Sequence, residues 1–194
     1  MPRSGAEARR RLQQAALELY RERGFDQTTT AEIAARAGVN ERTFFRHFPD
    51  KREVLFSGEA ELRAALEQGV AEAPEGLPVL DVLRHAFRAA RHVPEGNRSF
   101  AEPRMKVIAA TPALRERDLA KGASITESVA EALRKRGVPD RLCLLAAQTA
   151  WAAFAQAYTA WIADPSQSLD DHLIQAFADL RALITPTPTD DSTR

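Results

Sequence analysis

Residues 24–51 read GFDQTTTAEIAARAGVNERTFFRHFPDK, and this stretch decides the fold of the first part of the chain. Thr29, followed three residues later by Glu32, forms a capping-box pattern that predicts a short helix. The helix is expected to end at Gly38, because glycine favours helix C-termini. Asn40 can cap a second short helix, which must stop before the proline of the FPDK segment. Two short helices joined by a tight turn predict a helix-turn-helix motif.

The second of these short helices is expected to have a buried face and an exposed face. Phe44 and Phe48 lie one turn apart and should face the core. Arg42 and Arg46, also one turn apart, should point away from it, with Thr43 beside them. Cations and a hydroxyl in these places can meet the base edges and phosphates of DNA. The spacing alone also fits two solvated amphipathic helices of an ordinary α-helical protein.

The rest of the chain has a helical pattern as well. Apolar residues recur at helical spacing and strand signals are nearly absent, so the predicted fold class is all-α, with about nine helices. The helices expected outside the quoted stretch span roughly residues 6–23, 50–72, 79–92, 97–110, 112–136, 140–163 and 169–184. The helix from residue 50 is expected to be continuous behind a cap formed by Asp50 and Glu53.

The expected domain organisation is a helix-turn-helix DNA-binding domain at 1–50, a helical effector-binding and dimerisation domain at 51–184, and a disordered tail at 185–194. The formal net charge is zero, but residues 1–52 hold 11 Lys and Arg against 7 Asp and Glu. The remaining residues, 53–194, hold 16 against 20. A basic head on an acidic body is typical of a modular DNA-binding protein.

Several classes of protein are disfavoured by the sequence. The single cysteine, Cys143, allows no intrachain disulfide and fits a reducing compartment. No secretory signal and no stretch of 18 apolar residues is present, so a cytoplasmic location without a membrane partner is expected. There is no glycine-rich phosphate loop, nucleophile elbow or zinc pattern, and none of the four histidines has a glutamate three residues before it. We therefore expect no enzymatic activity, no cofactor and no metal.

The stretch 24–51 resembles the signature of the TetR family of repressors. The matching positions are Gly24-Phe25, Thr28-Thr29-Thr30, Ile33-Ala34, Ala37-Gly38-Val39, Thr43-Phe44-Phe45, His47-Phe48 and Lys51. The resemblance and the helix spacing together predict the DNA-binding residues Thr29, Thr30, Arg42, Thr43, Phe45, Arg46, His47 and Lys51. The resemblance implies that Thr29 and Thr30 bind phosphate and that His47 and Lys51 meet the DNA backbone. Phe45 stands where the family usually has Tyr, so a hydroxyl-to-phosphate hydrogen bond is missing.

The resemblance also implies that the last two helices pair with those of a second subunit as a four-helix bundle. The residues predicted for this interface are Leu142, Leu145, Ala146, Thr149, Ala153, Ala157, Trp161, Leu173, Phe177, Leu180 and Ile184. Many of the residues on the 140–163 helix are small, and small residues let two helices approach closely. The alternative is that the apolar stripes of both helices pack inside one subunit.

An effector pocket is expected among the central helices. Its candidate residues are Phe87, Phe100, Arg104, Met105, Ile108, Trp151, Phe154 and Tyr158, each of which could instead belong to the core. Arg104 could bind an anionic effector or lie on the surface. The segment ERTFFRHFPDK and residues 110–115 resemble a TetR subgroup whose ligands are acyl-CoA-like.

The function expected from these observations is transcriptional repression. A homodimer would bind a palindromic, double-stranded operator and be released by a small-molecule effector. The alternative is a helical protein-interaction or small-molecule-binding module without sequence-specific DNA binding. Charge reversal of Arg42 and Arg46 separates the two, because only the repressor would lose DNA affinity.

Overall fold

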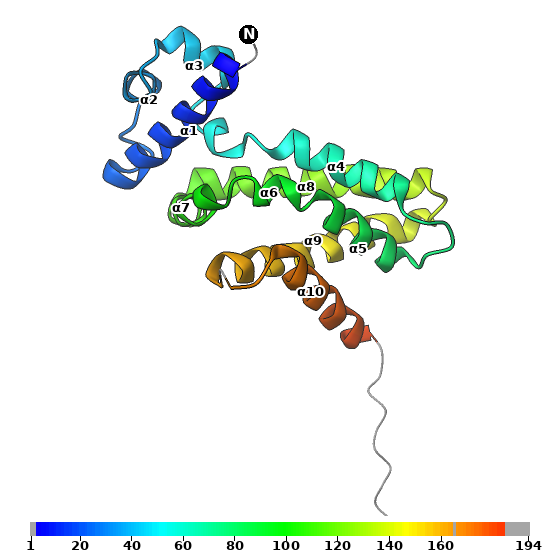
Figure 1. Ribbon diagram of the computed structural model, residues 1–194. Helices are drawn as coiled ribbons and strands as arrows, with labels where there is room; N and C mark the ends of the chain where they lie inside the picture. Colours follow the sequence, from blue (N-terminus) through cyan, green and yellow to red (C-terminus); the bar gives the residue numbers. More distant parts are fainter. Residues whose placement is uncertain (1–2, 165, 185–194) are drawn as a thin grey trace, which may run out of the picture. The chain divides into compact units, whose positions relative to one another are not determined.

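The computed structural model describes residues 3–164 and 166–184. Over these residues the chain is helical and contains no strand, which confirms the predicted all-α class. The α-helices are α1 (Arg3–Arg23), α2 (Thr30–Arg36), α3 (Glu41–His47), α4 (Glu59–Glu72), α5 (Val79–Ala90), α6 (His92–Glu95), α7 (Arg98–Ala110), α8 (Pro112–Lys135), α9 (Asp140–Ala163) and α10 (Leu169–Ile184) (Figure 1). A 3₁₀ turn, η1 (Glu53–Phe56), precedes α4. Of the described helices, α6 alone is a single turn, and the other nine have seven residues or more.

The described residues form two compact units. The first contains the residues up to 60 together with 97–122, and the second contains 61–96 and the residues from 123 onward. Helices α4 and α8 each contribute residues to both units. The predicted functional division at residue 50 is not tested by these contacts and stays a prediction. The tail predicted at 185–194 lies outside the described residues.

The first unit contains the helix-turn-helix, α2 and α3, and its local signals act as predicted. The backbone N–H of Thr29 donates to Glu32 Oε2 at 2.8 Å, and the N–H of Glu32 donates to Thr29 Oγ1 at 3.3 Å, so the capping box is present. Asn40 Oδ1 accepts from the N–H of Thr43 at 2.8 Å. Gly38 has a φ of +68° in the turn between α2 and α3, a conformation that glycine adopts without strain.

The continuous helix predicted over 50–72 is wrong, because the chain makes η1 first and starts α4 only at Glu59. Asp50 does act as a cap: its Oδ1 accepts from the N–H groups of Arg52 at 2.7 Å and Glu53 at 3.2 Å. The helix does not continue past the buried residues 54–56, because Ser57 and Gly58 follow and both have modest helix propensity.

The core of the second unit joins α5, α9 and α10. The ring centroid of Phe87 lies 5.3 Å from that of Phe154 and 6.1 Å from that of Phe177, so one buried aromatic group ties the three helices together. Helices α9 and α10 run beside each other (Figure 1, yellow to orange). Helices α4 and α5 approach closely at Gly69, where an added Cβ would lie 2.7 Å from the Cα of Ala86. No described helix is long and apolar enough to cross a membrane.

Candidate nucleic-acid interface

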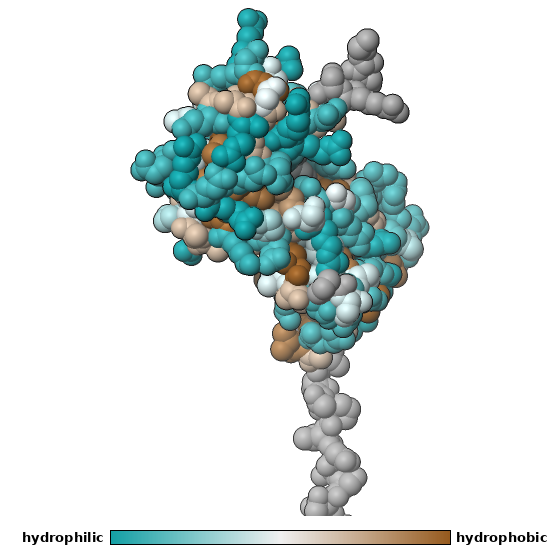
Figure 2. Space-filling view, turned by 60° about the vertical axis from the view of Figure 1, so that its left-hand side comes forward, coloured by the Kyte–Doolittle hydropathy of each residue, from teal (hydrophilic) through white to brown (hydrophobic). Residues whose placement is uncertain are grey.

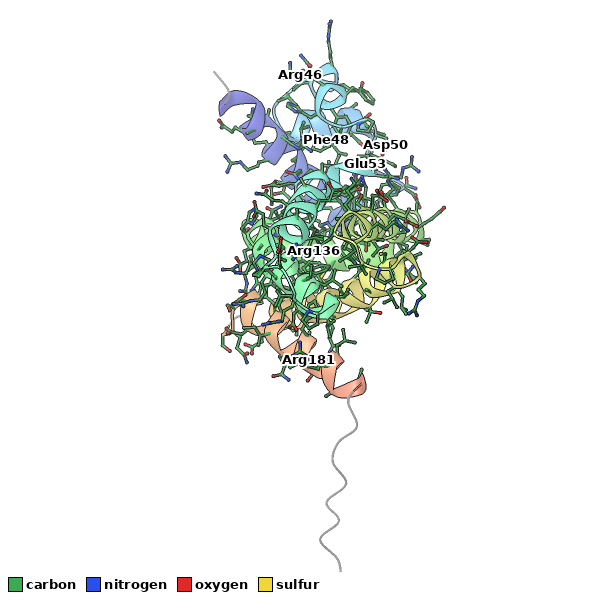
Figure 3. The ribbon with its side chains drawn as sticks, turned by 90° about the vertical axis from the view of Figure 1, so that its right-hand side faces the viewer. Arg46, Phe48, Asp50, Glu53, Arg136 and Arg181 are labelled. Atoms are coloured by element: carbon green, nitrogen blue, oxygen red, sulfur yellow. The ribbon has the colours of Figure 1, made fainter. Side chains whose placement is uncertain are left out.

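Helix α3 presents one face to the core of the first unit and the other to solvent. Phe44 and Phe48 are buried, at 0% and 2% exposed, as the helix spacing predicted. The opposite face, together with the cap residue, lines an open groove of about 520 Å³ formed by Asn40, Arg42, Thr43, Phe45 and Arg46. Figure 3 shows Arg46 on the outer side of the helix and Phe48 on the inner side. Four of the eight predicted DNA-binding residues therefore share one exposed surface.

The two arginines of this surface have no acceptor within the described chain. Arg42 and Arg46 are exposed, and neither forms a hydrogen bond or an ion pair with a residue that the structure describes. They lie one turn apart on the same helix. An arginine presents five N–H donors in a planar fork, which matches guanine O6 and N7 or a phosphate. The geometry therefore leaves two full sets of donors available to an external partner.

Phe45 stands between these arginines in sequence and is held by its neighbour. Its side chain is 53% exposed, and its ring meets that of Phe44 edge to face, with centroids 5.4 Å apart and an interplanar angle of 83°. On the face of the molecule shown in Figure 2, apolar spots (brown) are separated by hydrophilic surface (teal). An exposed and oriented aromatic ring can pack on a sugar or on a thymine methyl group.

The hydroxyls of Thr29 and Thr30 already have acceptors. Thr29 Oγ1 donates to Glu32 Oε2 at 2.8 Å, and Thr30 Oγ1 donates to Glu41 Oε1 at 2.5 Å. Either hydroxyl would have to exchange its carboxylate for a phosphate in order to bind DNA as predicted. Glu41 was not singled out from the sequence. Its position in the first turn of α3 is the signal that could have drawn attention to it.

His47 lies at the end of α3 and is half-buried. Burial first, and then the nearby cations Arg46 and Arg9, lower the pKa of His47 below the usual value for histidine. Its Nε2 is buried and has no hydrogen-bond partner among the described residues. The imidazole is therefore neutral at neutral pH, and it adds no charge to the interface. The eighth predicted residue, Lys51, directs its ammonium group to the loop that precedes α2 and away from the α3 groove.

The candidate effector residues are divided between the two units. Phe87, Trp151, Phe154 and Tyr158 lie in the second unit, where the ring of Phe154 contacts the other three with centroids 5.3–5.8 Å apart. The remaining candidates belong to the first unit: Phe100 and Ile108 are buried in its core, and Met105 and Arg104 are half-buried. The sequence order of these residues gave no sign of that division.

Arg104 is held by the first unit itself. Its Nε donates to the carbonyl oxygen of Leu55 at 2.6 Å, and its Nη2 donates to Asp118 at 3.3 Å. The guanidinium carbon also lies 5.1 Å from the centre of the Phe56 ring. The positive charge of Arg104 is thus already matched within the unit, so an anionic effector would have to displace these contacts.

The residues predicted for the dimer interface fall into two groups. Five of them are buried inside the second unit: Ala153, Ala157, Trp161, Leu173 and Phe177. Leu145 is 63% exposed, and four others are half-buried: Leu142, Ala146, Thr149 and Leu180. The side chain of Ile184 lies outside the described part of the chain.

Helices α9 and α10 also carry a stripe of residues that is open to solvent and is distinct from the predicted interface residues. On α9 the exposed residues include Ala152, Ala155 and Thr159, and on α10 they include Ile174 and Ala178. A groove of about 470 Å³ runs along this part of α10 and is lined by Arg84, Ile174, Phe177, Ala178, Arg181 and Ala182. Within the described residues no group of three His, Cys, Asp or Glu could hold a metal ion.

The amino-acid sequence matches two family models. Residues 12–57 match the model described as bacterial regulatory proteins of the tetR family. Residues 77–185 match the model described as the MftR C-terminal domain.

Individual relatives agree with these matches. The chain is 28% identical over 187 residues to a Mycobacterium tuberculosis protein named as the mycofactocin biosynthesis transcriptional regulator MftR, with 91% of this chain and 94% of that protein covered. A solved structure of the Thermus thermophilus repressor FadR in complex with lauroyl-CoA is 27% identical and has a TM-score of 0.52, covering 93% and 97% of the two chains. The structure of a TetR-family regulator of Syntrophomonas wolfei has a TM-score of 0.64 over 95% and 99% of the chains; at 16% identity this likeness shows the fold.

Proposed function

The chain belongs to the TetR family of bacterial regulatory proteins and carries a C-terminal domain of the MftR type, and we propose that it acts as a dimeric repressor released from its operator by a small molecule. As a member of this family it is a DNA-binding transcriptional regulator. In the proposal, residues 1–50 bind DNA, and residues 51–184 bind the effector and form the dimer.

The observation that carries the DNA-binding part of the proposal is the exposed face of α3. Arg42 and Arg46 have no acceptor among the described residues, and Thr43 and Phe45 line the same groove. Helix-turn-helix dimers place two such helices in successive major grooves, about 34–36 Å apart. The operator is therefore expected to be an inverted repeat with half-sites about one helical turn apart.

Selection from random duplex DNA tests this proposal directly. The purified protein is mixed with the DNA pool at low salt, and the retained DNA is sequenced. The affinity of the protein for the enriched sequence is then measured at increasing salt concentration. Enrichment of an inverted repeat, with affinity falling steeply as salt rises, supports an operator-binding dimer. If no sequence is enriched, the proposal of a dimeric repressor that binds a palindromic operator through α3 fails.

The dimer is proposed to form through the open stripe of α9 and α10. Ala152, Ala155 and Ala178 are small and exposed, so two copies of these helices can approach closely. Ala152→Glu is expected to shift the mass measured by light scattering from dimer to monomer. Ala120→Glu is the matched control, because Ala120 is an exposed helical alanine on α8. A variant Ala152→Glu that remains dimeric would place the interface elsewhere.

The effector is proposed to be acyl-CoA-like. Support comes from the FadR relative, which was solved with lauroyl-CoA, and from the apolar character of the aromatic group around Phe154 in the second unit. Titration of lauroyl-CoA into the operator complex is expected to lower operator affinity, and coenzyme A without the acyl chain is the control. Linkage requires DNA to weaken lauroyl-CoA binding by the same factor. Unchanged affinity would exclude this effector and leave the DNA-binding proposal intact.

A further inference from the structure

The ammonium group of Lys51 is fully bonded inside the first unit. Its Nζ donates to the carbonyl oxygens of Phe25 at 2.9 Å, Thr28 at 3.0 Å and Asp26 at 3.4 Å. A lysine ammonium has three N–H donors and no acceptor. All three donors are therefore used by the loop between α1 and α2, and none is left for a DNA phosphate.

Two aromatic residues, Tyr20 of α1 and Phe25 of the loop after it, also contact Lys51. Its Nζ lies 4.3 Å from the centre of the buried Phe25 ring, a distance that gives a favourable cation–π interaction. The Tyr20 hydroxyl donates to the carbonyl oxygen of Lys51 at 2.5 Å. Burial raises the pKa of Tyr20, so this hydroxyl stays protonated and keeps donating. The backbone and the side chain of Lys51 are thus both bound by residues 20–28.

The loop that Lys51 binds determines where α2 starts. Thr28 is fully buried, its hydroxyl donates to the Gly24 carbonyl oxygen at 2.8 Å, and the next residue, Thr29, is the cap of α2. The carbonyl oxygens of Phe25, Asp26 and Thr28 belong to no helix, so their hydrogen bonds to Lys51 hold the loop in one conformation. Because α2 packs on α3, the conformation of this loop also fixes the orientation of α3.

We propose that Lys51 is a positioning residue for DNA binding, which clamps the α1–α2 loop and makes no contact with a phosphate. This inference rests on the proposed DNA-binding function of α3. It differs from the role implied by the family resemblance, in which Lys51 meets the DNA backbone. The positive charge of Lys51 then acts on the loop carbonyls, and the DNA affinity depends on it only through the placement of α2 and α3.

The salt dependence of operator binding separates the two roles. A mutation that removes a cation bound to phosphate lowers the slope of log affinity against log salt by about 0.9. The clamp predicts that Lys51→Met weakens operator binding at least several-fold while this slope stays unchanged. Arg46→Met is the matched control: it removes an unpaired cation from the α3 face, and its slope is expected to fall. A lowered slope for Lys51→Met would overturn the clamp.

Lys51→Gln covers the case in which Lys51→Met does not fold. The glutamine amide lacks the charge but keeps two N–H donors for the loop carbonyls. The clamp predicts an unchanged salt slope and an affinity between those of the wild type and Lys51→Met. A phosphate contact predicts the lowered slope for Lys51→Gln as well, since the charge is gone.

A measurement without DNA keeps the clamp testable if the proposed function fails. Hydrogen exchange of the folded protein is expected to be faster at the amides of residues 24–29 in Lys51→Met or Lys51→Gln than in the wild type, while the α9 amides are unchanged. Equal exchange rates in the loop would overturn the clamp whether or not an operator is found. The proposed function itself fails separately, if the wild type selects no operator or if Arg46→Met keeps full affinity.

Discussion

Arginine side chains of the second unit and those on the exposed face of α3 are used in opposite ways. In the second unit, Arg88 forms a two-point pair with Asp170 at 2.7 and 2.6 Å. Arg136 (Figure 3) donates to four carbonyl oxygens at the end of α4 and in the loop after it, those of residues 70, 71, 73 and 74, at 2.5–3.3 Å. On α3, Arg42 and Arg46 bind no residue that the structure describes. An arginine bound inside its own unit stabilises the fold, whereas an unbound one keeps its donors for a partner.

The largest effect is expected from removing the unbound arginines. Arg42→Ala and Arg46→Ala should each cost about 1–3 kcal/mol of DNA binding, which is about thirtyfold in affinity for the middle of that range. The double variant should lose about a hundredfold or more. Fluorescence anisotropy with a labelled operator at fixed salt measures these losses. The melting temperature should change little, because neither side chain is bound within the described chain.

Arg134→Ala is the control for this comparison. Arg134 is a half-buried arginine of the second unit, paired with Asp140 at 2.5 Å and Glu131 at 3.1 Å. Its removal is expected to leave DNA affinity unchanged. An equal loss of affinity in Arg134→Ala would mean that overall charge, rather than the α3 arginines, determines binding.

The next effect concerns stability and not DNA contact. Gly69→Ala places a Cβ 2.7 Å from the Cα of Ala86, so the backbone of α5 must move. Overpacking of this kind is expected to lower the free energy of unfolding by about 1–3 kcal/mol. Gly5→Ala in α1 is the opposite case, because its Cβ would meet only the His47 ring at 4.0 Å. That change should stabilise α1 by up to about 1 kcal/mol. Chemical denaturation of both variants measures their free energies of unfolding. Equal free energies of unfolding for Gly69→Ala and Gly5→Ala would contradict this prediction.

The helix-turn-helix was predictable from the sequence because its signals are local. The Thr29 and Asn40 caps lie within three residues of their partners, and both were read from the sequence. Lys51 bonds to carbonyl groups 23 to 26 residues away, and no spacing rule identifies them. The interruption before α4 is equally non-local, since it accompanies the burial of residues 54–56 in the core of the first unit.

On α9 the limits predicted for the helix are correct, but its faces could not be assigned. Alanine lies on both sides: Ala150 and Ala153 are buried, whereas Ala152 and Ala155 are exposed. A stripe of small residues therefore gives no contrast between core and surface, and five of the interface residues chosen from the sequence lie in the core. Only the packing of α5 and α10 against α9 distinguishes the faces.

The pair between Arg88 and Asp170 gives the second unit a pH dependence. The Arg88 hydrogen bonds lower the pKa of Asp170 below its ordinary value, and Arg91, at 3.8 Å, adds to this. A depressed folded-state pKa stabilises the protein above the unfolded value and loses that contribution as the pH falls through the folded value. Asp170→Asn should therefore cost about 1 kcal/mol at pH 7, because the pair is partly exposed.

Melting curves of the wild type and Asp170→Asn from pH 7 to pH 2 check this sign. The difference in melting temperature is expected to be constant down to about pH 4, the ordinary value for aspartate, and to shrink below it. Asp179→Asn is the control, since Asp179 is exposed and, among the described residues, accepts a hydrogen bond only from Gln175, a neutral partner. A difference that persists at pH 2 would show that Asp170 contributes through packing rather than through its charge.

The smallest effect is expected at Phe45, the one aromatic ring of the α3 groove. Phe45→Tyr adds a hydroxyl that can donate to a phosphate, and one such hydrogen bond contributes about 1 kcal/mol, or about fivefold in affinity. Because phosphates carry no sequence information, the gain should be equal on the operator and on random duplex DNA. A gain confined to the operator would instead assign the ring at position 45 to base recognition. In that case the unbound arginines would supply affinity, and the ring between them would supply part of the specificity.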